Sequence, residues 1–201
     1  MTETHSTSPI QPPFRRATSD DAGALAEFVE LASEGLAVYL WSTIAAGGRD
    51  PWEIGRARVR AETNPVFYGN AIVTDLAGQP AAGMIGYPAD RKAGPVSDEL
   101  PALLVPLQEL MNEATDTWYV HVLAAYAQYR GRGLGTAFLA LADRLAASAR
   151  RPGLSLIVSD TNVGARRLYE SCGYREVARR KMIKEAWQHP GRDWVLLRKT
   201  L

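Results

Sequence analysis

Three alternate glycines, Gly131, Gly133 and Gly135, separate an apolar run of the sequence from an amphipathic one. The apolar run, residues 117–125, is rich in β-branched and aromatic side chains and predicts a strand. The run that follows, up to Arg151, repeats apolar residues at helical spacing and predicts a helix. Because glycine lacks a Cβ atom, backbone N–H groups can approach a ligand closely, and a helix start adds unpaired donors and partial positive charge. The spacing therefore predicts a cradle for a pyrophosphate group.

The expected cradle is a continuous segment whose backbone N–H groups bind phosphate while two arginines add positive charge. Its residues are Arg130, Gly131, Arg132, Gly133, Leu134, Gly135 and Thr136. A dinucleotide-binding fingerprint, G-x-G-x-x-G, is a second interpretation, but Thr136 occupies the position of its third glycine. Asp160, after the next expected strand at residues 154–158, could imitate the ribose-binding acid of that motif. An NAD-dependent oxidoreductase therefore stays open as an alternative.

A second segment, residues 160–174, has the composition of a short capped helix. Asn162 is a typical residue for the start of a helix, and Gly173 is a typical residue just past the end of one. We expect this helix to follow the strand at residues 154–158.

Together the two segments resemble the GNAT superfamily of acyl-CoA-dependent N-acyltransferases. Arg130-x-x-Gly133-x-Gly135 is similar to the pyrophosphate loop of that family. Asn162-x-x-Ala165-x-x-Leu168-Tyr169-x-x-x-Gly173-Tyr174 is similar to its second coenzyme A element, in the family's order and at its usual separation. The resemblance covers residues 117–182 and names the donor of the reaction but not the acceptor.

The resemblance implies an α/β fold with a central mixed, mostly antiparallel β-sheet flanked by helices, and acetyl-CoA as cosubstrate. It also implies that the strand end pairs with the pantetheine arm of the donor and offers an N–H group to an oxyanion. The further coenzyme A-binding residues implied in this way are Leu123, Ala124, Ala125, Asn162 and Ala165. Tyr169 is implied as the acid that protonates the departing thiolate, and a phenol with its ordinary pKa near ~10 carries that proton at neutral pH.

The general base is less certain from the sequence, because many family members place a glutamate on the strand before the loop and this chain does not. Strict alternation along that strand would put Tyr119, His121 and Leu123 on one face and Trp118, Val120 and Val122 on the other. His121 is the candidate base, with an expected pKa between about 6 and 7.5. The alternative is that His121 only hydrogen-bonds the acceptor or lines its pocket. Glu34 and Asp75 are more distant candidates.

Length and composition indicate one enzyme domain. The chain has 201 residues, of which 46% are hydrophobic, enough to form a proper core. Lys and Arg total 23 against 22 Asp and Glu, a net charge of +1 that predicts neither a nucleic-acid nor a membrane partner. Residues 1–13 lack the apolar core of a signal peptide, so we expect a disordered tail there and a cytoplasmic location for the protein. Residues 14–201 are expected to form a single domain.

The remaining pattern predicts elements on both sides of the two motifs. Strands are expected at residues 14–17, 67–75, 81–87, 175–182 and 194–201, with a hairpin at 76–80. Helices are expected after Ser19, with an interruption at Gly35, and from Pro51 to Glu62. Residues 90–116 form an insertion, and its helical segment at about 97–114 should be broken or kinked by Pro101 and Pro106.

Other side chains with possible chemistry have a structural interpretation. Cys172, the single cysteine, lies in the last turn of a predicted helix, where the dipole disfavours a thiolate, so a buried structural role is favoured over an acyl-cysteine. The sequence has only three histidines, one of them in the tail, so no metal site is expected. Tyr39, Trp41 and Trp52 lie between the N-terminal helices and could form an acceptor pocket or simply the core.

The sequence therefore predicts an N-acetyltransferase that moves an acetyl group from acetyl-CoA to a primary amine by direct attack in a ternary complex. The alternative is a non-catalytic coenzyme A or acyl-CoA sensor. A small-molecule acceptor, such as a polyamine, amino acid or aminoglycoside, is favoured over a protein, and an acidic pocket would favour a polyamine. A homodimer is a further possibility.

Overall fold

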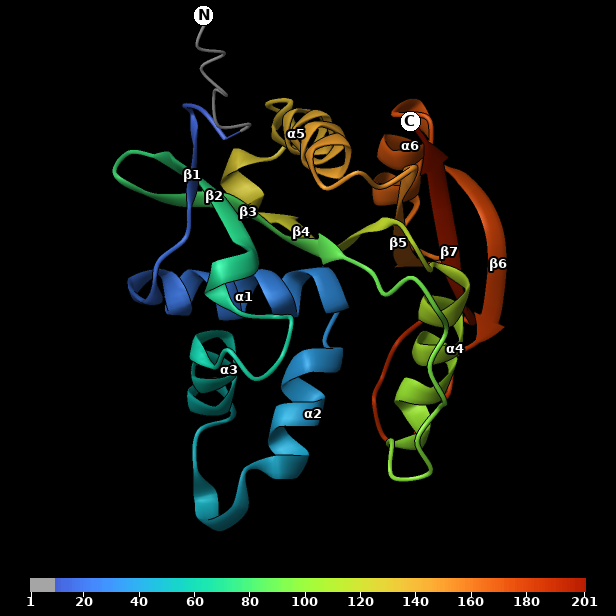
Figure 1. Cartoon of the computed structure of the whole chain (residues 1–201). Coiled ribbons are helices and arrows are strands. Elements are labelled where there is room, and N and C mark those ends of the chain that lie inside the picture. The colour runs from blue at the N-terminus through green and yellow to red at the C-terminus, as the bar shows by residue number, and fades with distance from the viewer. Residues whose placement is uncertain (1–9) are drawn as a thin grey trace, which may run out of the picture.

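The computed structural model describes residues 10–201 and shows a seven-stranded sheet in the order β1-β2-β3-β4-β5-β7-β6 (Figure 1). The strands are β1 (Phe14–Arg16), β2 (Ala71–Leu76), β3 (Gln79–Pro88), β4 (Trp118–Ala125), β5 (Gly153–Ser159), β6 (Arg175–Lys181) and β7 (Asp193–Thr200). The helices are α1 (Ala22–Ser33), α2 (Leu36–Ile44), α3 (Pro51–Arg60), α4 (Val105–Glu113), α5 (Leu134–Ser148) and α6 (Val163–Ser171). The expected α/β architecture is confirmed; residues 1–9 of the expected tail lie outside the described residues.

The sheet is mixed, with one parallel pair at its centre. All neighbouring strands run antiparallel except β4 and β5. This parallel pair is short, since only Trp118 and Tyr119 of β4 are paired, with Leu154 and Ser155 of β5. Beyond Tyr119 the two strands separate, so the rest of β4 presents an unpaired edge toward β5 (Figure 1). The fold thus opens a gap in the middle of the sheet.

Helices cover both faces of the sheet and form separate cores with it. On one face α5 packs against β3, β4 and β5, and its residues Phe138, Leu141 and Leu145 lie in a cluster with Leu156 of β5. On the other face α1 packs against β3 and β4, with Phe28 in the core (Figure 1). Burial of these side chains supplies the main stabilisation of the layers.

Two features of the N-terminal half differ from the sequence-based prediction. The expected strand at residues 67–75 is wrong in its first part, because residues 68–70 form a 3-10 turn and β2 starts at Ala71. The chain turns back there so that the Phe67 ring packs directly over the Cα of Gly69, where any Cβ atom would collide. The expected break at Gly35 is confirmed: Glu34 and Gly35 have φ angles of 54° and 95° and separate α1 from a distinct α2.

The two prolines of the insertion begin structure instead of breaking it, so the predicted kink is wrong. Pro101 precedes a 3-10 turn at residues 102–104, and Pro106 lies in the first turn of helix α4. A first-turn N–H has no intrahelical acceptor, so proline costs nothing there. Arg180 of β6 holds α4 to the sheet through Glu109, at 2.8 Å, and Glu113. No helix among residues 10–201 is long and apolar enough to cross a membrane.

Candidate active site

A β-bulge places His121 at the point where β4 leaves β5. Ile85 of β3 pairs with Val122 and Gly86 pairs with Val120, which leaves His121 as the extra residue of β4. The bulge makes strict alternation wrong for this strand. Val122 faces the same cavity as His121, whereas Leu123 packs into the core on the α5 side. The bulge therefore turns two consecutive side chains to one face and helps to separate the strands.

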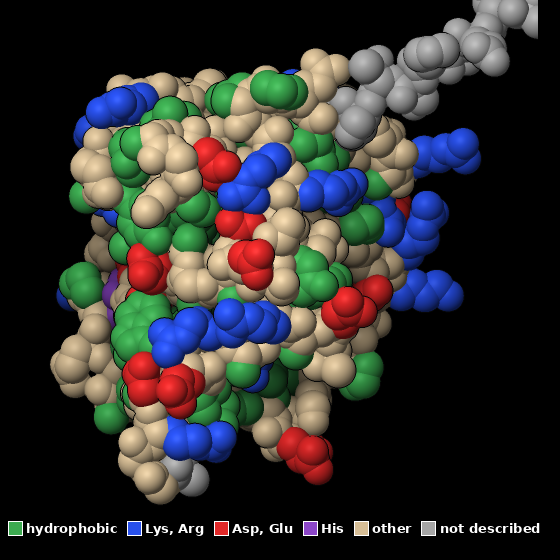
Figure 2. All heavy atoms as spheres, turned by 90° about the vertical axis from the view of Figure 1, so that its left-hand side faces the viewer, with side chains coloured by type: hydrophobic (Ala, Val, Ile, Leu, Met, Phe, Trp, Pro, Cys, Tyr) green, Lys and Arg blue, Asp and Glu red, His purple; other side chains and the backbone are tan. Residues whose placement is uncertain are grey.

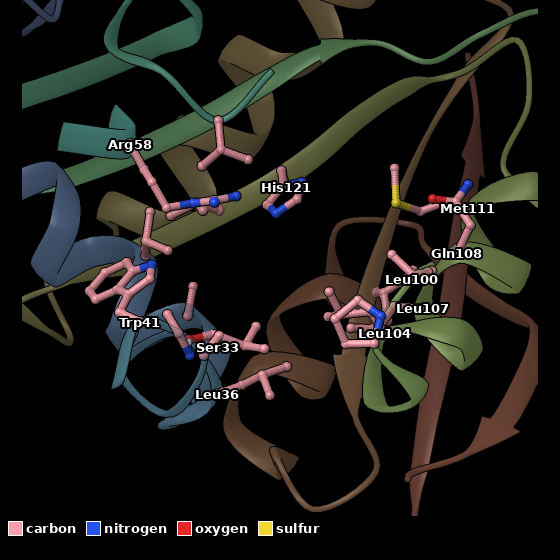
Figure 3. Close-up of a pocket in the computed structure, with 18 of the residues that line it drawn as sticks. Ser33, Leu36, Trp41, Arg58, Leu100, Leu104, Leu107, Gln108, Met111 and His121 are labelled. Carbon is pink, nitrogen blue, oxygen red and sulfur yellow. Dashed lines mark hydrogen bonds between the residues drawn. The ribbon is translucent and has the colours of Figure 1, made fainter. Parts of the chain in front are cut away.

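A cavity of about 520 Å³ lies against this bulge, within the usual size range of small-ligand sites (Figure 3). Its walls come from the sheet, from α1, α2 and α3, and from the insertion. The apolar lining includes Val29, Leu36, Leu40, Trp41, Val59, Leu100, Leu104, Leu107, Met111, Val122, Ile157 and Trp194. Since His121 and Ile157 belong to β4 and β5, the cavity reaches the gap between the two strands.

His121 borders this cavity as a neutral imidazole. The apolar surroundings favour the uncharged ring and lower the pKa of His121 to about 4, so the sequence-based expectation of 6 to 7.5 is too high. The Tyr87 hydroxyl lies 2.9 Å from Nδ1 of His121. When Nδ1 carries the proton and donates it to the Tyr87 oxygen, the lone pair of Nε2 is free to accept a hydrogen bond from an amine.

The glycine loop forms an open cradle at the end of β4. Gly131 and Gly133 have φ angles of 72° and 75°, and a Cβ atom built on either would meet no protein atom within 4 Å. Within residues 10–201, none of the backbone N–H groups from Gly131 to Thr136 donates to another group of the chain. Gly133 is the N-cap of α5, so these donors lie at the positive end of a helix. The loop has the donors, the space and the polarity that a pyrophosphate needs.

Gly135 has a different reason to be glycine. A Cβ atom there would lie 2.7 Å from a side-chain carbon of Leu168, so its absence lets the start of α5 pack against α6. The two arginines brace the loop from within: Arg130 Nε donates to the Ala125 carbonyl at 3.1 Å, and the Arg132 guanidinium lies 5.6 Å from the centroid of the Tyr129 ring. The motif thus combines two glycines required by conformation with one required by helix packing.

Tyr169 is buried in the core cluster that α5 forms with the sheet. Its hydroxyl has no hydrogen-bond partner within the described part of the chain. Burial, and secondarily the negative charge of Glu34, raise the pKa of Tyr169 to about 12. The phenol is therefore protonated at neutral pH and its proton is not engaged by another residue. This is the state that an acid for a thiolate requires.

Glu34 is the partner that sequence reasoning could not place. Its carboxylate accepts hydrogen bonds from Asn162 Nδ2 and from His189 Nε2, the latter at 2.6 Å. Nδ1 of His189 accepts from the Gly191 N–H at 3.0 Å, which fixes the proton on Nε2. Trp187 stacks on the imidazole with ring centroids 4.6 Å apart. Three loops far apart in sequence thus meet at one carboxylate.

Asn162 fulfils its expected capping role, since its side-chain oxygen accepts from the Ala165 N–H at 3.1 Å at the start of α6. The backbone N–H of Ala165 is therefore already bonded. In the sequence, Gly35 directly after Glu34 indicates a turn between two helices, but nothing there indicates that Glu34 contacts Asn162 or His189. Residues 34, 162 and 189 meet only in the folded chain.

The remaining candidates have structural roles. Asp75 is committed to an ion pair with Arg15 at 2.6 Å and does not line the cavity. Cys172 ends α6 and packs against the core. Trp41 lines the cavity and packs edge-on against Trp52, with centroids 5.7 Å apart, whereas Tyr39 bonds to Glu185. Of the aromatic cluster, only Trp41 serves the cavity.

Comparison with known families assigns the chain to a family. The model of the acetyltransferase (GNAT) family matches residues 38–174, which include the bulged strand, the cradle and α6. The chain therefore belongs to the GNAT family of acetyltransferases. Among curated proteins, no sequence matches this chain.

Solved structures share the fold at low sequence identity. One described as an acetyltransferase has a TM-score of 0.63 and 20% identity, covering 93% of this chain and 98% of its own. An N-acetyltransferase from Staphylococcus aureus Mu50 has a TM-score of 0.60 and 18% identity, with 92% and 98% covered. A ribosomal-protein-alanine N-acetyltransferase from Brucella melitensis has a TM-score of 0.54 and 23% identity, with 94% and 99% covered. These likenesses establish the architecture and not the acceptor.

Proposed function

We propose that this chain transfers an acetyl group from acetyl-CoA to a primary amine by direct attack in a ternary complex. The observation that carries the proposal is the position of the cavity. Its wall includes His121 of β4 and Ile157 of β5, at the gap that leads along β4 to the open N–H cradle. A thioester held by the cradle and by the unpaired edge of β4 would have its carbonyl at the mouth of the cavity.

The donor would be held mainly by backbone groups. The N–H groups from Gly131 to Thr136 would bind the pyrophosphate, and the edge of β4 at Leu123, Ala124 and Ala125 would pair with the amides of the pantetheine arm. A strand-end N–H of β4 would stabilise the oxyanion that forms at the carbonyl oxygen. Asn162, on the loop after β5, would contact coenzyme A from the opposite side of the gap.

The reaction requires a neutral amine at the thioester carbon. The amine nitrogen forms a bond to that carbon, the C–S bond breaks, and the sulfur leaves as a thiolate. Tyr169 would donate its proton to the sulfur, since its pKa of about 12 keeps it protonated at neutral pH. The amine loses one proton to water in the same cycle, and Tyr169 regains a proton from water, so the proton lost by the amine balances the one the thiolate gains.

The cavity favours the neutral amine through desolvation. No carboxylate lines it within residues 10–201, so the charged ammonium form gains no counterion there, and burial among apolar groups lowers the pKa of an amine. His121, with its pKa near 4, would accept an N–H hydrogen bond and pass the proton to water instead of retaining it. His121 would therefore orient the amine and relay its proton to water, and would not act as a strong base.

Release of coenzyme A thiol from acetyl-CoA, measured against a panel of amines, tests the proposal. The panel should contain apolar amino acids, their amides, simple alkylamines, a polyamine and an aminoglycoside. We expect thiol release that depends on the amine and is lost in the double variant Tyr169→Phe, His121→Asn. Tight binding of coenzyme A without amine-dependent release would contradict acetyl transfer and support the sensor alternative.

A further inference from the structure

One charged side chain lines the acceptor cavity, and it is a cation. Arg58 of α3 is the only Asp, Glu, Lys or Arg among the lining residues that the structure describes. The polar remainder is uncharged, and the rest of the wall is aliphatic or aromatic. A polycation would therefore meet repulsion and no compensating acid. The described lining of this cavity therefore does not provide the acidic pocket that would favour a polyamine.

Arg58 has no partner of its own. Its guanidinium makes no hydrogen bond or ion pair within residues 10–201, whereas Arg56, two residues earlier, bonds to Asp50 at 3.3 Å. The side chain is exposed, so the open cavity lets water solvate it until a ligand enters. Once a ligand displaces that water, an unpaired charge becomes costly, and an anion on the ligand removes the cost. The planar fork of arginine suits a carboxylate in particular.

The direction of the side chain relates this anion site to the reaction. In Figure 3, Arg58 and His121 extend toward one another, while Leu100, Leu104, Leu107 and Met111 lie on the opposite side of the cavity. A ligand whose amine meets His121 and whose anion meets Arg58 has the two groups close together in its structure. Its remaining part would fill the space toward the leucines of the insertion.

The face of the molecule shown in Figure 2 does not supply the same preference. On the side formed by α1, α3 and the β2–β3 hairpin, acidic and basic side chains are interspersed and neither sign dominates (Figure 2). The net charge is +1, so long-range attraction of anions is weak. Within the cavity, the group that can select an anionic ligand is Arg58.

We propose that the acceptor is a free apolar α-amino acid, with Arg58 binding its carboxylate and the leucine-rich wall of the cavity binding its side chain. This inference rests on the proposed acetyl transfer and narrows its substrate class. A peptide N-terminus is disfavoured, because its carboxylate lies far along the chain from the reacting amine. In a free amino acid the two groups share one carbon atom.

The test compares acceptors that differ only in the anion. Thiol release from acetyl-CoA is measured with leucine, methionine and phenylalanine, with leucinamide and isoamylamine as acceptors lacking a carboxylate, and with leucyl-glycine as the peptide. We expect leucine to exceed leucinamide in kcat/KM by roughly 10²-fold, and Arg58→Gln to remove that preference by lowering only the leucine value. Arg58→Lys should restore it in part. Arg60→Gln is the matched control, because Arg60 lies on the same helix but does not line the cavity.

A parallel binding measurement separates this inference from the proposed function. Leucine is titrated by calorimetry into protein saturated with coenzyme A, for the wild type, Arg58→Gln and Arg60→Gln. Binding that depends on Arg58, without turnover of any amine, would support the carboxylate site and contradict acetyl transfer. Turnover of amines in which carboxylates bring no advantage, or in which Arg58→Gln leaves the preference unchanged, would overturn the inference and leave acetyl transfer intact. Failure of all three amino acids both to bind and to react would also overturn it.

Discussion

The proposed donor side of this molecule, the glycine loop, and its proposed acceptor side, the cavity, are built by different physical means. The cradle uses consecutive backbone N–H groups of one short loop and two glycines in left-handed conformation. The cavity uses side chains gathered from the sheet, α1, α2, α3 and the insertion. Backbone recognition concentrates its requirements in a few neighbouring residues, whereas side-chain recognition distributes them. A loop of this kind can therefore be recognised in a sequence, whereas a cavity of this kind cannot.

The two sides also differ in charge. The donor side offers several donors at a helix start, with two arginines beside them, for a group that carries multiple negative charges. The acceptor side has one unpaired arginine within apolar walls. Two further groups, Tyr169 and His121, have pKa values that desolvation shifts in opposite directions, to about 12 and about 4. Desolvation thus keeps both neutral at physiological pH, the state that their proposed roles as proton donor and hydrogen-bond acceptor require.

The largest expected effect is on the donor side. Gly133→Glu places a carboxylate in the cradle and strains a position with φ of 75°, so coenzyme A binding measured by calorimetry should be abolished. Gly78→Glu is the control, because Gly78 has a similar φ of 79° and open surroundings but lies in the β2–β3 turn. If Gly133→Glu stays folded and binds coenzyme A within a few-fold of wild type, the pyrophosphate assignment is wrong.

Tyr169→Phe addresses the boundary between the two sides. The variant keeps the ring and removes the proton donor, so kcat should fall roughly 10²- to 10⁴-fold while coenzyme A affinity stays close to wild type. Tyr174→Phe is the matched control, since Tyr174 is also buried and its hydroxyl is without a partner within the described residues. Equal losses in both variants would assign Tyr169 to packing.

His121→Asn tests the acceptor side with a smaller expected effect. If His121 orients the amine and passes its proton to water, the variant's kcat/KM should fall roughly 10- to 10²-fold without loss of acetyl-CoA binding. The wild-type profile should show no limb from His121 between pH 6 and 7.5, because its pKa lies near 4. A wild-type limb in the 6 to 7.5 range that disappears in the variant would restore His121 as an ordinary base.

The same shift predicts a dependence of stability on pH. The pKa of His121 is about 4 in the folded chain and about 6.5 when unperturbed, so the unfolded chain takes up the proton first as pH falls. The free energy of unfolding should therefore be unaffected by the protonation of His121 above pH ~6.5 and should decrease progressively as the pH falls to about 4. The melting temperature of His121→Asn should therefore depend less steeply on pH over this range than that of the wild type.

The smallest expected effect is at Glu34, which joins the two sides without lining the cavity. Glu34→Gln removes the charge that faces His189 and Asn162, so the loops after β5 and β6 should hold their positions less well. We expect a three- to tenfold fall in kcat and a loss of roughly 1 to 3 kcal/mol in the free energy of unfolding, measured by urea titration. Glu53→Gln is the control, an exposed carboxylate without an ion pair in the described chain. Identical behaviour of the two variants would reduce Glu34 to a surface residue.

Sequence reasoning identified most elements but misplaced features that depend on neighbours. The hairpin of β2 and β3, the helices α5 and α6 and the C-terminal strands lie where their periodicity and turn residues predict them. Pro106 was read as a helix breaker, although at the first turn it is a helix initiator. The strand alternation around His121 was wrong, because a bulge arises from the pairing of two strands and leaves no mark on one of them.

The sequence by itself determined the fold class and the glycine loop at the start of α5, because glycine conformation, helix capping and hydrophobic periodicity are local properties of the chain. Only the tertiary structure decided how far β4 and β5 separate and which carboxylate meets Asn162 and His189. It also decided that, among residues 10–201, Arg58 is the one Asp, Glu, Lys or Arg that lines the cavity. Those outcomes depend on segments distant in sequence that packing brings together. The pKa values of Tyr169 and His121 belong to the same class, since burial, which no residue type specifies alone, sets them.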